Sequence, residues 1–327
     1  MKLKVFGILV LGALCMGSPA IADPLTFLVA DDSSSGTYKE MLGEIIKMCS
    51  TPDFTITEVG NKGGALGNLE ALVNNKAQAA FMHSDVLAAA GLYDKSYADK
   101  YRTLLALYKE DIHIVALRNS ITKEGGVMGF GATTKDFNSL SDLDGYKIGA
   151  AGGGTKTAQI LIGQGGAKFT AINYDSGGDL LPALDKGDVQ AVIFVGGAPL
   201  PNIAGLTADK YKLLPIDNSY IGRLKDIYDP TQITYTNLGA SQVQTLAPTA
   251  TIVTRVYKTP KFVEAQKTFR TCFYDHLDEM KETPDLHPKW QEVEAWYHGK
   301  WTWLDLPGDQ VAQETPDTSA SSSAAPQ

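Results

Sequence analysis

The sequence predicts an α/β protein whose chain forms two lobes with a ligand cleft between them. From residue 25 onward, short apolar runs alternate with amphipathic segments, which is the pattern of strands connected by helices over a largely parallel sheet. This alternation occurs twice, first in residues 25–117 and again in residues 146–195. The length of 327 residues exceeds what one compact domain usually holds, so two lobes are expected.

In the first lobe, the apolar runs predict strands at residues 25–30, 54–59 and 79–82. The amphipathic segments between and after them predict helices at residues 37–48, 65–74 and 85–92. Two pieces rich in β-forming residues follow, at residues 103–108 and 112–117. A glycine-rich segment, residues 125–131, interrupts the alternation and is expected to be a surface loop.

The second lobe repeats the pattern, with strands expected at residues 146–150, 169–174 and 189–195 and helices at residues 155–162 and 180–186. A β-branched run at residues 250–256 and a helix at residues 260–280 are interpreted as a return to the first lobe. The predicted boundaries are a signal peptide (1–22), the first part of lobe 1 (23–118), lobe 2 (119–245), the return to lobe 1 with the C-terminal helices (246–310) and a disordered tail (311–327).

Residues 1–22 have the features of a secretory signal peptide. Lys2 and Lys4 precede an apolar run of twelve residues, and the small-x-small triplet Ala20-Ile21-Ala22 follows. A helix that crosses a bilayer needs about 20 apolar residues, so this run is too short to be an anchor. We expect cleavage before Asp23, release into the periplasm and no membrane insertion after cleavage.

The charge and the cysteines restrict the partners and the compartment. The net charge is −8 at pH 7, and loss of Lys2 and Lys4 with the signal peptide changes it to −10. Scattered acidic charge makes nucleic acid an unfavourable partner, and none is expected. Cys49 and Cys272 remain after cleavage, and the sequence leaves open whether they form a disulfide or two buried thiols.

Two turns that open helices are the strongest candidates for a ligand site. Gly36, Thr37 and Tyr38 follow the first strand, and Gly154 and Thr155 occupy the equivalent place in the second lobe. Hydroxyls and amides at the positive end of a helix suit a carboxylate or a phosphate. The same residue types are also ordinary helix caps, so the prediction depends on their matching positions in the two lobes.

The sequence lacks a feature that is required for nucleotide binding, for hydrolase activity and for metal binding. Residues 149–155 nearly match a phosphate loop, but Thr155 stands where that loop needs a lysine. His83, Ser84 and Asp85 are adjacent in the chain and cannot align as a nucleophile relay, and no G-x-S-x-G turn is present. The five histidines lack the spacing of metal ligands. We therefore expect no enzyme activity, no cofactor and no metal.

Taken in order, several segments resemble the TAXI family of TRAP transporter solute-binding proteins. The resemblance covers residues 25–280 and rests on Ser35-Gly36-Thr37-Tyr38, the turn 63–69 with Asn68, the strand end 77–85, the segments 104–117 and 140–145, Gly152-Gly153-Gly154-Thr155 and Gly196-Gly197-Ala198-Pro199. His83 replaces the glutamine of the family, which puts the family's usual ligand in doubt.

The resemblance implies a type II-like periplasmic binding protein that closes on a small carboxylate or amino acid, such as glutamate, glutamine or 2-oxoglutarate. It also implies delivery of this solute to the membrane permease subunits of a TRAP-type secondary transporter. A periplasmic sensor that signals to a membrane receptor is the alternative. The resemblance implies that the residues that contact the ligand are Gly36, Thr37, Tyr38, Asn68, Ser84, Asp85, Gly154, Thr155 and Pro199. We add His83 as the residue that we expect to change the ligand specificity.

Overall fold

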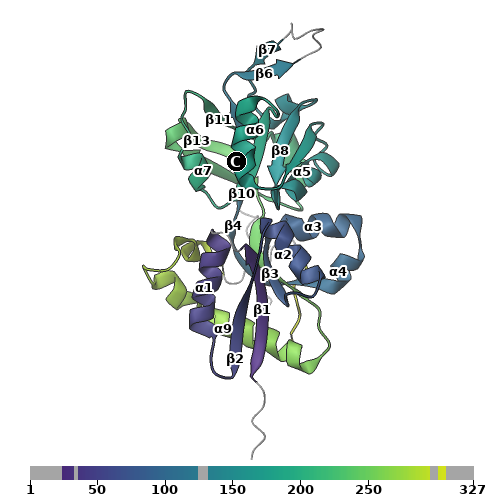
Figure 1. Cartoon of the computed structure of the whole chain (residues 1–327), viewed down its shortest axis with the longest axis vertical. Coiled ribbons are helices and arrows are strands. Elements are labelled where there is room, and N and C mark those ends of the chain that lie inside the picture. Colours follow the sequence, from purple (N-terminus) through teal and green to yellow (C-terminus); the bar gives the residue numbers. More distant parts are fainter. Residues whose placement is uncertain (1–23, 33–35, 124–131, 295–300, 307–327) are drawn as a thin grey trace, which may run out of the picture.

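The computed structural model describes residues 24–32, 36–123, 132–294 and 301–306. The predicted signal peptide, the glycine-rich segment 125–131 and the predicted C-terminal tail lie outside these residues. Two lobes stack along the long axis of the molecule, and each is built on its own five-stranded sheet (Figure 1). Within the described part of the chain, no helix has the length and apolar character needed to cross a membrane.

Lobe 1 contains a mixed sheet whose strands lie in the order β2 (Phe54–Asn61), β1 (Leu25–Asp32), β3 (Ala79–His83), β14 (Thr249–Arg255) and β4 (Tyr101–Lys109). Strand β1 pairs in parallel with β2 and β3, whereas β14 runs antiparallel to β3 and β4. Every residue of β3 is buried, because this apolar strand lies near the middle of a sheet that is covered on both faces.

Helices cover both faces of the lobe 1 sheet. Phe27 and Val29 of β1 pack with the core that includes α1 and α9, whereas Ala30 packs with α2. Neighbouring residues of a strand point to opposite faces, so the two groups of helices lie on opposite sides. The helices of this lobe are α1 (Thr37–Cys49), α2 (Gly64–Val73), α3 (Ser84–Tyr93), α4 (Ser96–Lys100) and α9 (Pro260–Glu282).

Lobe 2 contains a sheet in the order β11 (Tyr211–Leu214), β5 (Asp111–Leu117), β10 (Ala191–Gly196), β8 (Lys147–Ala151) and β9 (Thr170–Tyr174). Strand β8 is parallel to β9 and β10, and β5 is antiparallel to β10 and β11. The helices of this lobe are α5 (Gly154–Gly163), α6 (Leu180–Lys186), α7 (Pro201–Ala204) and α8 (Asn218–Leu224).

Two hairpins complete lobe 2. Strands β12 (Asp229–Tyr235) and β13 (Ala240–Ala247) form the first, which packs against the main sheet. Strands β6 (Ser120–Lys123) and β7 (Ala132–Lys135) form the second, which projects from the far end of lobe 2 (Figure 1). The predicted glycine-rich segment lies between β6 and β7.

The chain passes between the lobes twice, and the two passages lie side by side. Strand β4 continues into β5 at Glu110, and β13 returns to β14 at Pro248. The Glu110 N–H donates a hydrogen bond of 2.9 Å to the Pro248 carbonyl oxygen. Two adjacent connections of this kind can act as a hinge. The first passage comes earlier than the predicted boundary at residue 118, because β5 pairs with β10 and so belongs to the second sheet.

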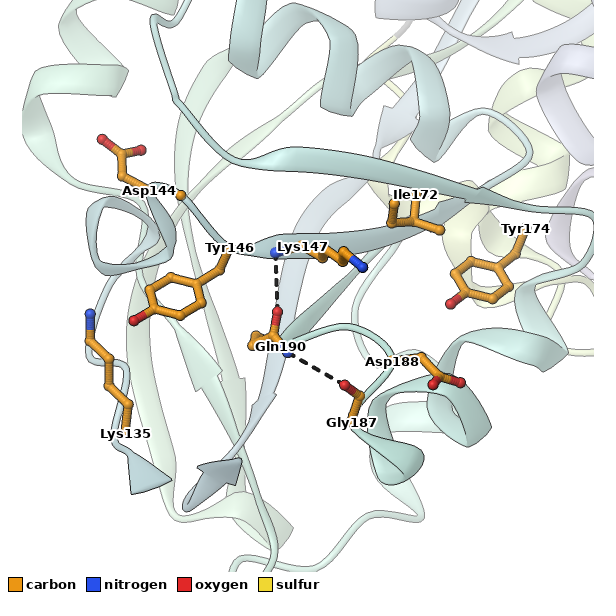
Figure 2. Close-up of a pocket in the computed structure, with 10 residues that line it drawn as sticks. Lys135, Asp144, Tyr146, Lys147, Ile172, Tyr174, Gly187, Asp188 and Gln190 are labelled. Atoms are coloured by element: carbon orange, nitrogen blue, oxygen red, sulfur yellow. Dashed lines mark hydrogen bonds between the residues drawn. The ribbon is translucent and has the colours of Figure 1, made fainter. Parts of the chain in front are cut away.

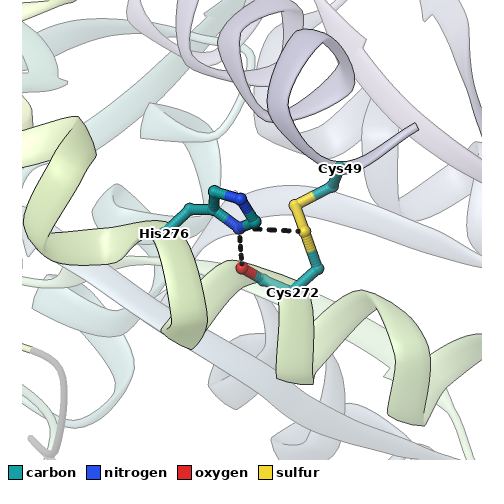
Figure 3. Close-up of side chains that lie close together, drawn as sticks. All are labelled: Cys49, Cys272 and His276. Atoms are coloured by element: carbon teal, nitrogen blue, oxygen red, sulfur yellow. Dashed lines mark hydrogen bonds between the residues drawn. A yellow bond between two sulfur atoms is a disulfide. The ribbon is translucent and has the colours of Figure 1, made fainter. Parts of the chain in front are cut away.

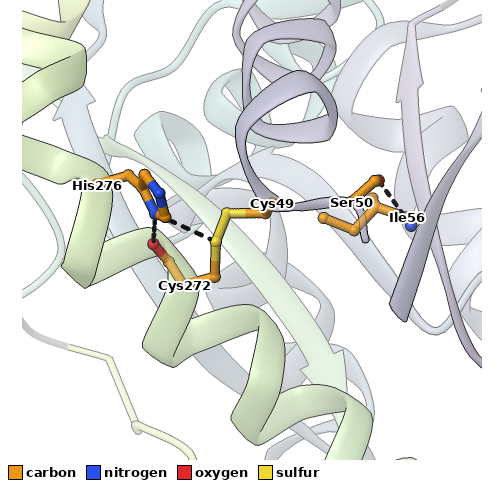
Figure 4. The surroundings of a disulfide bond; sticks show 5 residues. All are labelled: Cys49, Ser50, Ile56, Cys272 and His276. Carbon is orange, nitrogen blue, oxygen red and sulfur yellow. Dashed lines mark hydrogen bonds between the residues drawn. A yellow bond between two sulfur atoms is a disulfide. The ribbon is translucent and has the colours of Figure 1, made fainter. Parts of the chain in front are cut away.

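Cys49 and Cys272 form a disulfide within lobe 1 (Figure 3). It joins the last residue of α1 to α9, two segments separated by 223 positions in the sequence (Figure 4). The sequence left open whether these cysteines form a disulfide or two buried thiols, and the structure contains the disulfide. In the chain-entropy view, closing so long a loop stabilises the folded state by about 5 kcal/mol.

Candidate functional site

The parallel strands of both lobes end at the junction between the lobes. Strands β1 and β3 end there in lobe 1, directly before α1 and α3, and β8 ends there in lobe 2, directly before α5 (Figure 1). Open α/β sheets bind ligands at the carboxyl ends of their strands. The helix-opening turns predicted from the sequence therefore face one common junction.

The lobes touch at glycine-rich turns that leave no room for side chains. A Cβ on Gly152 of lobe 2, which has a φ of +52°, would lie 3.1 Å from the carbonyl oxygen of Gly63 in lobe 1. A Cβ on Gly153 would lie 2.0 Å from Nε2 of His83. The missing side chains thus allow the start of α5 to approach the end of β3 directly.

Asp85, at the start of α3, is the centre of a hydrogen-bond network that joins the lobes. Its Oδ1 contacts Nδ1 of His83 within lobe 1. Its Oδ2 accepts hydrogen bonds from two lobe 2 hydroxyls, those of Thr157 at 2.7 Å and Tyr228 at 2.6 Å. Asp85, Thr157 and Tyr228 are all fully buried. Both carboxylate oxygens are therefore used inside the protein, and Asp85 fixes the lobes against each other.

The pKa shifts of His83 and Asp85 are those of an ion pair. Burial lowers the pKa of His83, but the charge and hydrogen bond of Asp85 raise it above 6.5 overall. Burial raises the pKa of Asp85, but the charge of His83 and three hydrogen bonds lower it below 3.8 overall. Stability from His83 is thus complete below pH 6.5 and is lost as the pH rises through the folded-state pKa. Stability from Asp85 is present above pH 3.8 and is lost as the pH falls through its lowered pKa.

Glu110 lies at the first passage between the lobes, beside the turn that opens α1. Its side chain is buried, and its Oε2 accepts a hydrogen bond of 2.5 Å from the hydroxyl of Tyr38. Burial raises the pKa of Glu110, as do the charges of Asp85 and Asp111, whereas the charge of His83 and the bond from Tyr38 act against this rise. The hinge thus carries a carboxylate that is coupled to the ion pair of His83 and Asp85.

A second contact between the lobes involves the turn after β10. Lys289 of lobe 1 donates a hydrogen bond of 3.1 Å to the carbonyl oxygen of Ala198 and binds both oxygens of Glu292 at 2.6 and 2.7 Å. The N–H of Ala198 donates to Oδ2 of Asp111 at 3.2 Å. A Cβ on Gly197 would lie 2.5 Å from Cε of Lys289, so any side chain at this position would displace the end of the lysine.

A buried histidine holds the same turn from within lobe 2. Nδ1 of His113 lies 2.9 Å from the carbonyl oxygen of Asp111, and its Nε2 lies 2.9 Å from the hydroxyl of Tyr235. That hydroxyl accepts the N–H of Leu200 at 2.7 Å. Burial lowers the pKa of His113 to about 4. The ring is therefore neutral at pH 7, with Nδ1 donating to the carbonyl and Nε2 accepting from the hydroxyl.

Five of the residues predicted to bind ligand lie in the turns at this junction. Gly36 is exposed and has a φ of +118°, a value that favours glycine. The Thr37 side chain hydrogen-bonds Tyr108. The Thr155 hydroxyl donates to the carbonyl oxygen of Gly152 at 2.8 Å and so closes its own turn. Gly154 is buried beside it, and Pro199 is exposed in the turn held by His113.

Three other predicted residues have structural partners instead. Asn68 lies inside lobe 1, where its amide donates to the Phe81 carbonyl oxygen at 2.7 Å and its oxygen contacts Asn61. Ser84 accepts the N–H of Thr249 at 3.1 Å and so ties α3 to the second passage. Asp85 joins the lobes as described above. The structure gives these side chains a role in holding the site together, and direct contact with a ligand stays a prediction for them.

The sequence profile of the NMT1-like family matches residues 30–295, which is most of the chain. The chain belongs to the NMT1-like family. No curated protein sequence matches it significantly. Its two lobes, each built on a five-stranded sheet and joined by a double passage, form a mixed α/β architecture.

Solved structures with a similar fold include several binding proteins. An amino acid ABC transporter substrate-binding protein from Streptococcus pneumoniae, bound to L-arginine, is 13% identical over 82% of this chain and 96% of its own, with a TM-score of 0.48. The GluR0 ligand-binding core from Nostoc punctiforme, in complex with L-glutamate, is 11% identical over 82% and 96%, with a TM-score of 0.45. An arginine periplasmic binding protein from Legionella pneumophila is 14% identical over 79% and 95%, with a TM-score of 0.43.

Several residues of the junction in this NMT1-like protein were missed by sequence reasoning. Glu110, Thr157, Tyr228 and Lys289 are far apart in the chain and belong to no common motif. Glu110 did leave a signal in the sequence, because three charged residues, Lys109-Glu110-Asp111, stand between two apolar β-forming runs. Charged residues between two apolar strands indicate that the chain passes from one hydrophobic core to another at that point.

A hollow of about 770 Å³ opens elsewhere on the NMT1-like protein, and all of its lining residues belong to lobe 2 (Figure 2). Lys135, Tyr146 and Lys147 line one part of it, and Tyr174 and Asp188 line another. None of the inter-lobe contacts between described residues reported above involves these side chains. The predicted location of the ligand between the lobes therefore does not coincide with this hollow.

Two clusters of potentially reactive side chains in the NMT1-like protein have structural roles. Ser84 bonds the Thr249 amide while His83 bonds Asp85, so the three adjacent residues do not form a nucleophile relay. Cys49, Cys272 and His276 lie close enough for a metal, and Nδ1 of His276 is 3.4 Å from Sγ of Cys272 (Figure 3). Since both sulfur atoms are bonded to each other, neither is a thiolate ligand.

Proposed function

We propose that this NMT1-like protein is the extracytoplasmic solute-binding subunit of a TRAP-type secondary transporter. It binds a small carboxylate or amino acid between its lobes and delivers it to the membrane permease subunits. The observation that carries the proposal is the junction itself, where polar and charged side chains from both lobes are buried beside a double passage that can bend. These groups find partners in each other when the lobes are together, and a solute that contacts both lobes there would add further contacts to that closed state.

The mechanism is closure of the lobes about the two passages at Glu110 and Pro248. The contacts of Asp85 with Thr157 and Tyr228 exist only when the lobes are together, so they favour the closed state. A ligand shifts the equilibrium further if it binds that state more tightly than the open one. Closure then presents surfaces of both lobes to the permease in a fixed relation.

Export supports this assignment. The N-terminal segment has the sequence of a signal peptide, and the disulfide between Cys49 and Cys272 suits an oxidising compartment outside the cytoplasm. The choice of a TRAP transporter rests on the ordered motifs that resemble the TAXI family, including the turns at Gly36 and Gly154. Ligand contacts are proposed for these turns and for His83.

A thermal-shift screen of the mature chain, residues 23–327, tests the proposal. The panel contains amino acids, keto acids, dicarboxylates and sugars. A ligand present at about 1,000 times its dissociation constant adds roughly 4 kcal/mol of stability. We expect one chemical class to raise the melting temperature and the rest to leave it unchanged. No shift with any class would contradict solute binding, and a shift without ligand uptake in permease-containing vesicles would favour the sensor alternative.

A further inference from the structure

We propose that Cys49, Cys272 and His276 form a redox-controlled binding site for a thiophilic divalent cation such as Zn²⁺. The disulfide closes this site, and reduction by a dithiol opens it, so that two thiolates and one imidazole bind the metal. The site lies at the end of α1 opposite to the junction, about 18 Å along the helix from Thr37. It goes beyond the proposed function, because it needs neither a solute nor closure of the lobes.

The ligand atoms already lie at distances that suit one metal ion. One ligand atom from each of the three residues lies within 4.8 Å of the other two. Nδ1 of His276 is 3.4 Å from Sγ of Cys272 (Figure 3). A nitrogen and a sulfur bound to the same tetrahedral zinc, at about 2.1 and 2.3 Å, lie about 3.6 Å apart. The observed separation is therefore close to that of two neighbouring ligands of one zinc ion.

The two helices supply the ligands from fixed positions. Cys272 and His276 are four residues apart on α9, so their side chains share one face of the helix. Cys49 ends α1, and its Cα is 5.8 Å from that of Cys272. Two sulfur ligands of a tetrahedral zinc lie about 3.8 Å apart. Once the bond between them is broken, rotation about the Cα–Cβ bonds can bring the sulfurs to this separation while both helices stay in place.

The imidazole can turn to a metal without leaving a buried group unsatisfied. Nδ1 of His276 lies 3.0 Å from the carbonyl oxygen of Cys272, but that oxygen is also the helical acceptor of the His276 backbone N–H. His276 is half-buried, so its Nε2 can carry the ring proton and donate it to water. Ser50 does not compete as a ligand, because its hydroxyl accepts the Ile56 N–H at 3.2 Å (Figure 4). The three residues thus leave one tetrahedral position for water.

Opening the site is a two-electron reduction followed by metal binding. A dithiol attacks Sγ of Cys272, which is more exposed than the buried Cys49, and the S–S bond breaks by thiol–disulfide exchange. The protein gains two electrons and two protons as two thiols, and the dithiol becomes a cyclic disulfide. Zn²⁺ then displaces both thiol protons and forms two Zn–S bonds. The metal thereby replaces the disulfide as the connection between α1 and α9.

Cobalt titration of the mature chain, residues 23–327, tests the proposal, because Co²⁺ binds to zinc sites and its absorption reports thiolate ligands. The protein is reduced with dithiothreitol, separated from it by gel filtration without oxygen, and titrated with Co²⁺. We expect one Co²⁺ per reduced chain, with a thiolate-to-cobalt charge-transfer band that Zn²⁺ abolishes, and no band in the oxidised chain. A reduced and folded chain without this band would overturn the proposal.

His276→Gln tests the imidazole and leaves both cysteines in place. Asp275→Asn is its matched control, because Asp275 is exposed at the neighbouring position of α9 and points to a different side of the helix. We expect His276→Gln to weaken Co²⁺ binding at least tenfold and to shift the visible d–d bands, whereas Asp275→Asn changes neither. The same affinity and spectrum in His276→Gln and the wild type would refute the three-ligand site.

Circular dichroism of the reduced chain shows whether it stays folded without the disulfide. If it unfolds, Zn²⁺ should restore the folded spectrum, because the three ligands come together only in the folded state, and should restore less of it in His276→Gln. Failure of Zn²⁺ to restore the fold would contradict the proposal. Solute binding by the oxidised chain is measured separately, so either result leaves the proposed function intact.

Discussion

Replacing Gly153 by alanine is expected to weaken ligand binding without damaging either lobe. Gly153 has a φ of −59° and a ψ of −31°, so alanine fits its backbone conformation. The new Cβ would nevertheless lie 2.0 Å from Nε2 of His83, where an ordinary contact begins at 3.4 Å. The start of α5 and the end of β3 must therefore separate by about 1.4 Å, or His83 must leave Asp85.

Either response destabilises the closed state. Overpacking at a buried contact costs about 1–3 kcal/mol, and losing a hydrogen bond to a charged group costs about 1.5–3 kcal/mol. Since each 1.4 kcal/mol is a factor of ten in affinity, the dissociation constant should rise by about 10- to 100-fold. Apart from Ala89 of α3, which packs in the core of lobe 2, the buried residues of these two cores each come from one lobe, so the ligand-free protein should unfold at nearly its normal temperature.

The assay is calorimetric titration with the tightest compound from the panel, together with thermal unfolding of the ligand-free protein. Gly163→Ala is the matched control, because it lies at the other end of the same helix and a Cβ there meets nothing within 4 Å. An affinity of Gly153→Ala within twofold of the wild type and of Gly163→Ala would show that the lobes do not close on this contact.

Three other outcomes test the remaining contacts. Tyr228→Phe removes one hydrogen bond from Asp85 and should reduce ligand affinity about tenfold, measured by calorimetry, because a bond to a buried charge contributes about 1.5–3 kcal/mol. The wild type should lose unfolding free energy as the pH rises above 6.5 and His83 is deprotonated, and His83→Gln should abolish this contribution. Parallel urea titrations of the two proteins at several pH values check this. Cys272→Ser should lower the unfolding free energy by about 2–5 kcal/mol in urea titrations and leave ligand affinity unchanged, since the disulfide lies within lobe 1.

Local periodicity was enough to predict most elements of the two sheets. The runs at residues 25–30, 54–59 and 79–82 correspond to β1, β2 and β3, and the predicted helices at 37–48 and 155–162 correspond to α1 and α5. These elements are apolar on the faces that they bury, so their pattern is visible in the sequence. Residues 200–248 carry weaker patterns, and the structure forms α7, α8, β11, β12 and β13 there.

The sequence by itself determined the α/β class, the two lobes and the glycine turns that open α1 and α5, because each depends on residues close together in the chain. Only the tertiary structure decided what joins the lobes. Asp85 meets a hydroxyl 72 positions away on Thr157 and another 143 positions away on Tyr228, and Glu110 meets Tyr38 across 72 positions. No local pattern records such pairs, since their charge, burial and pKa shifts arise only when distant segments exclude water from the same place.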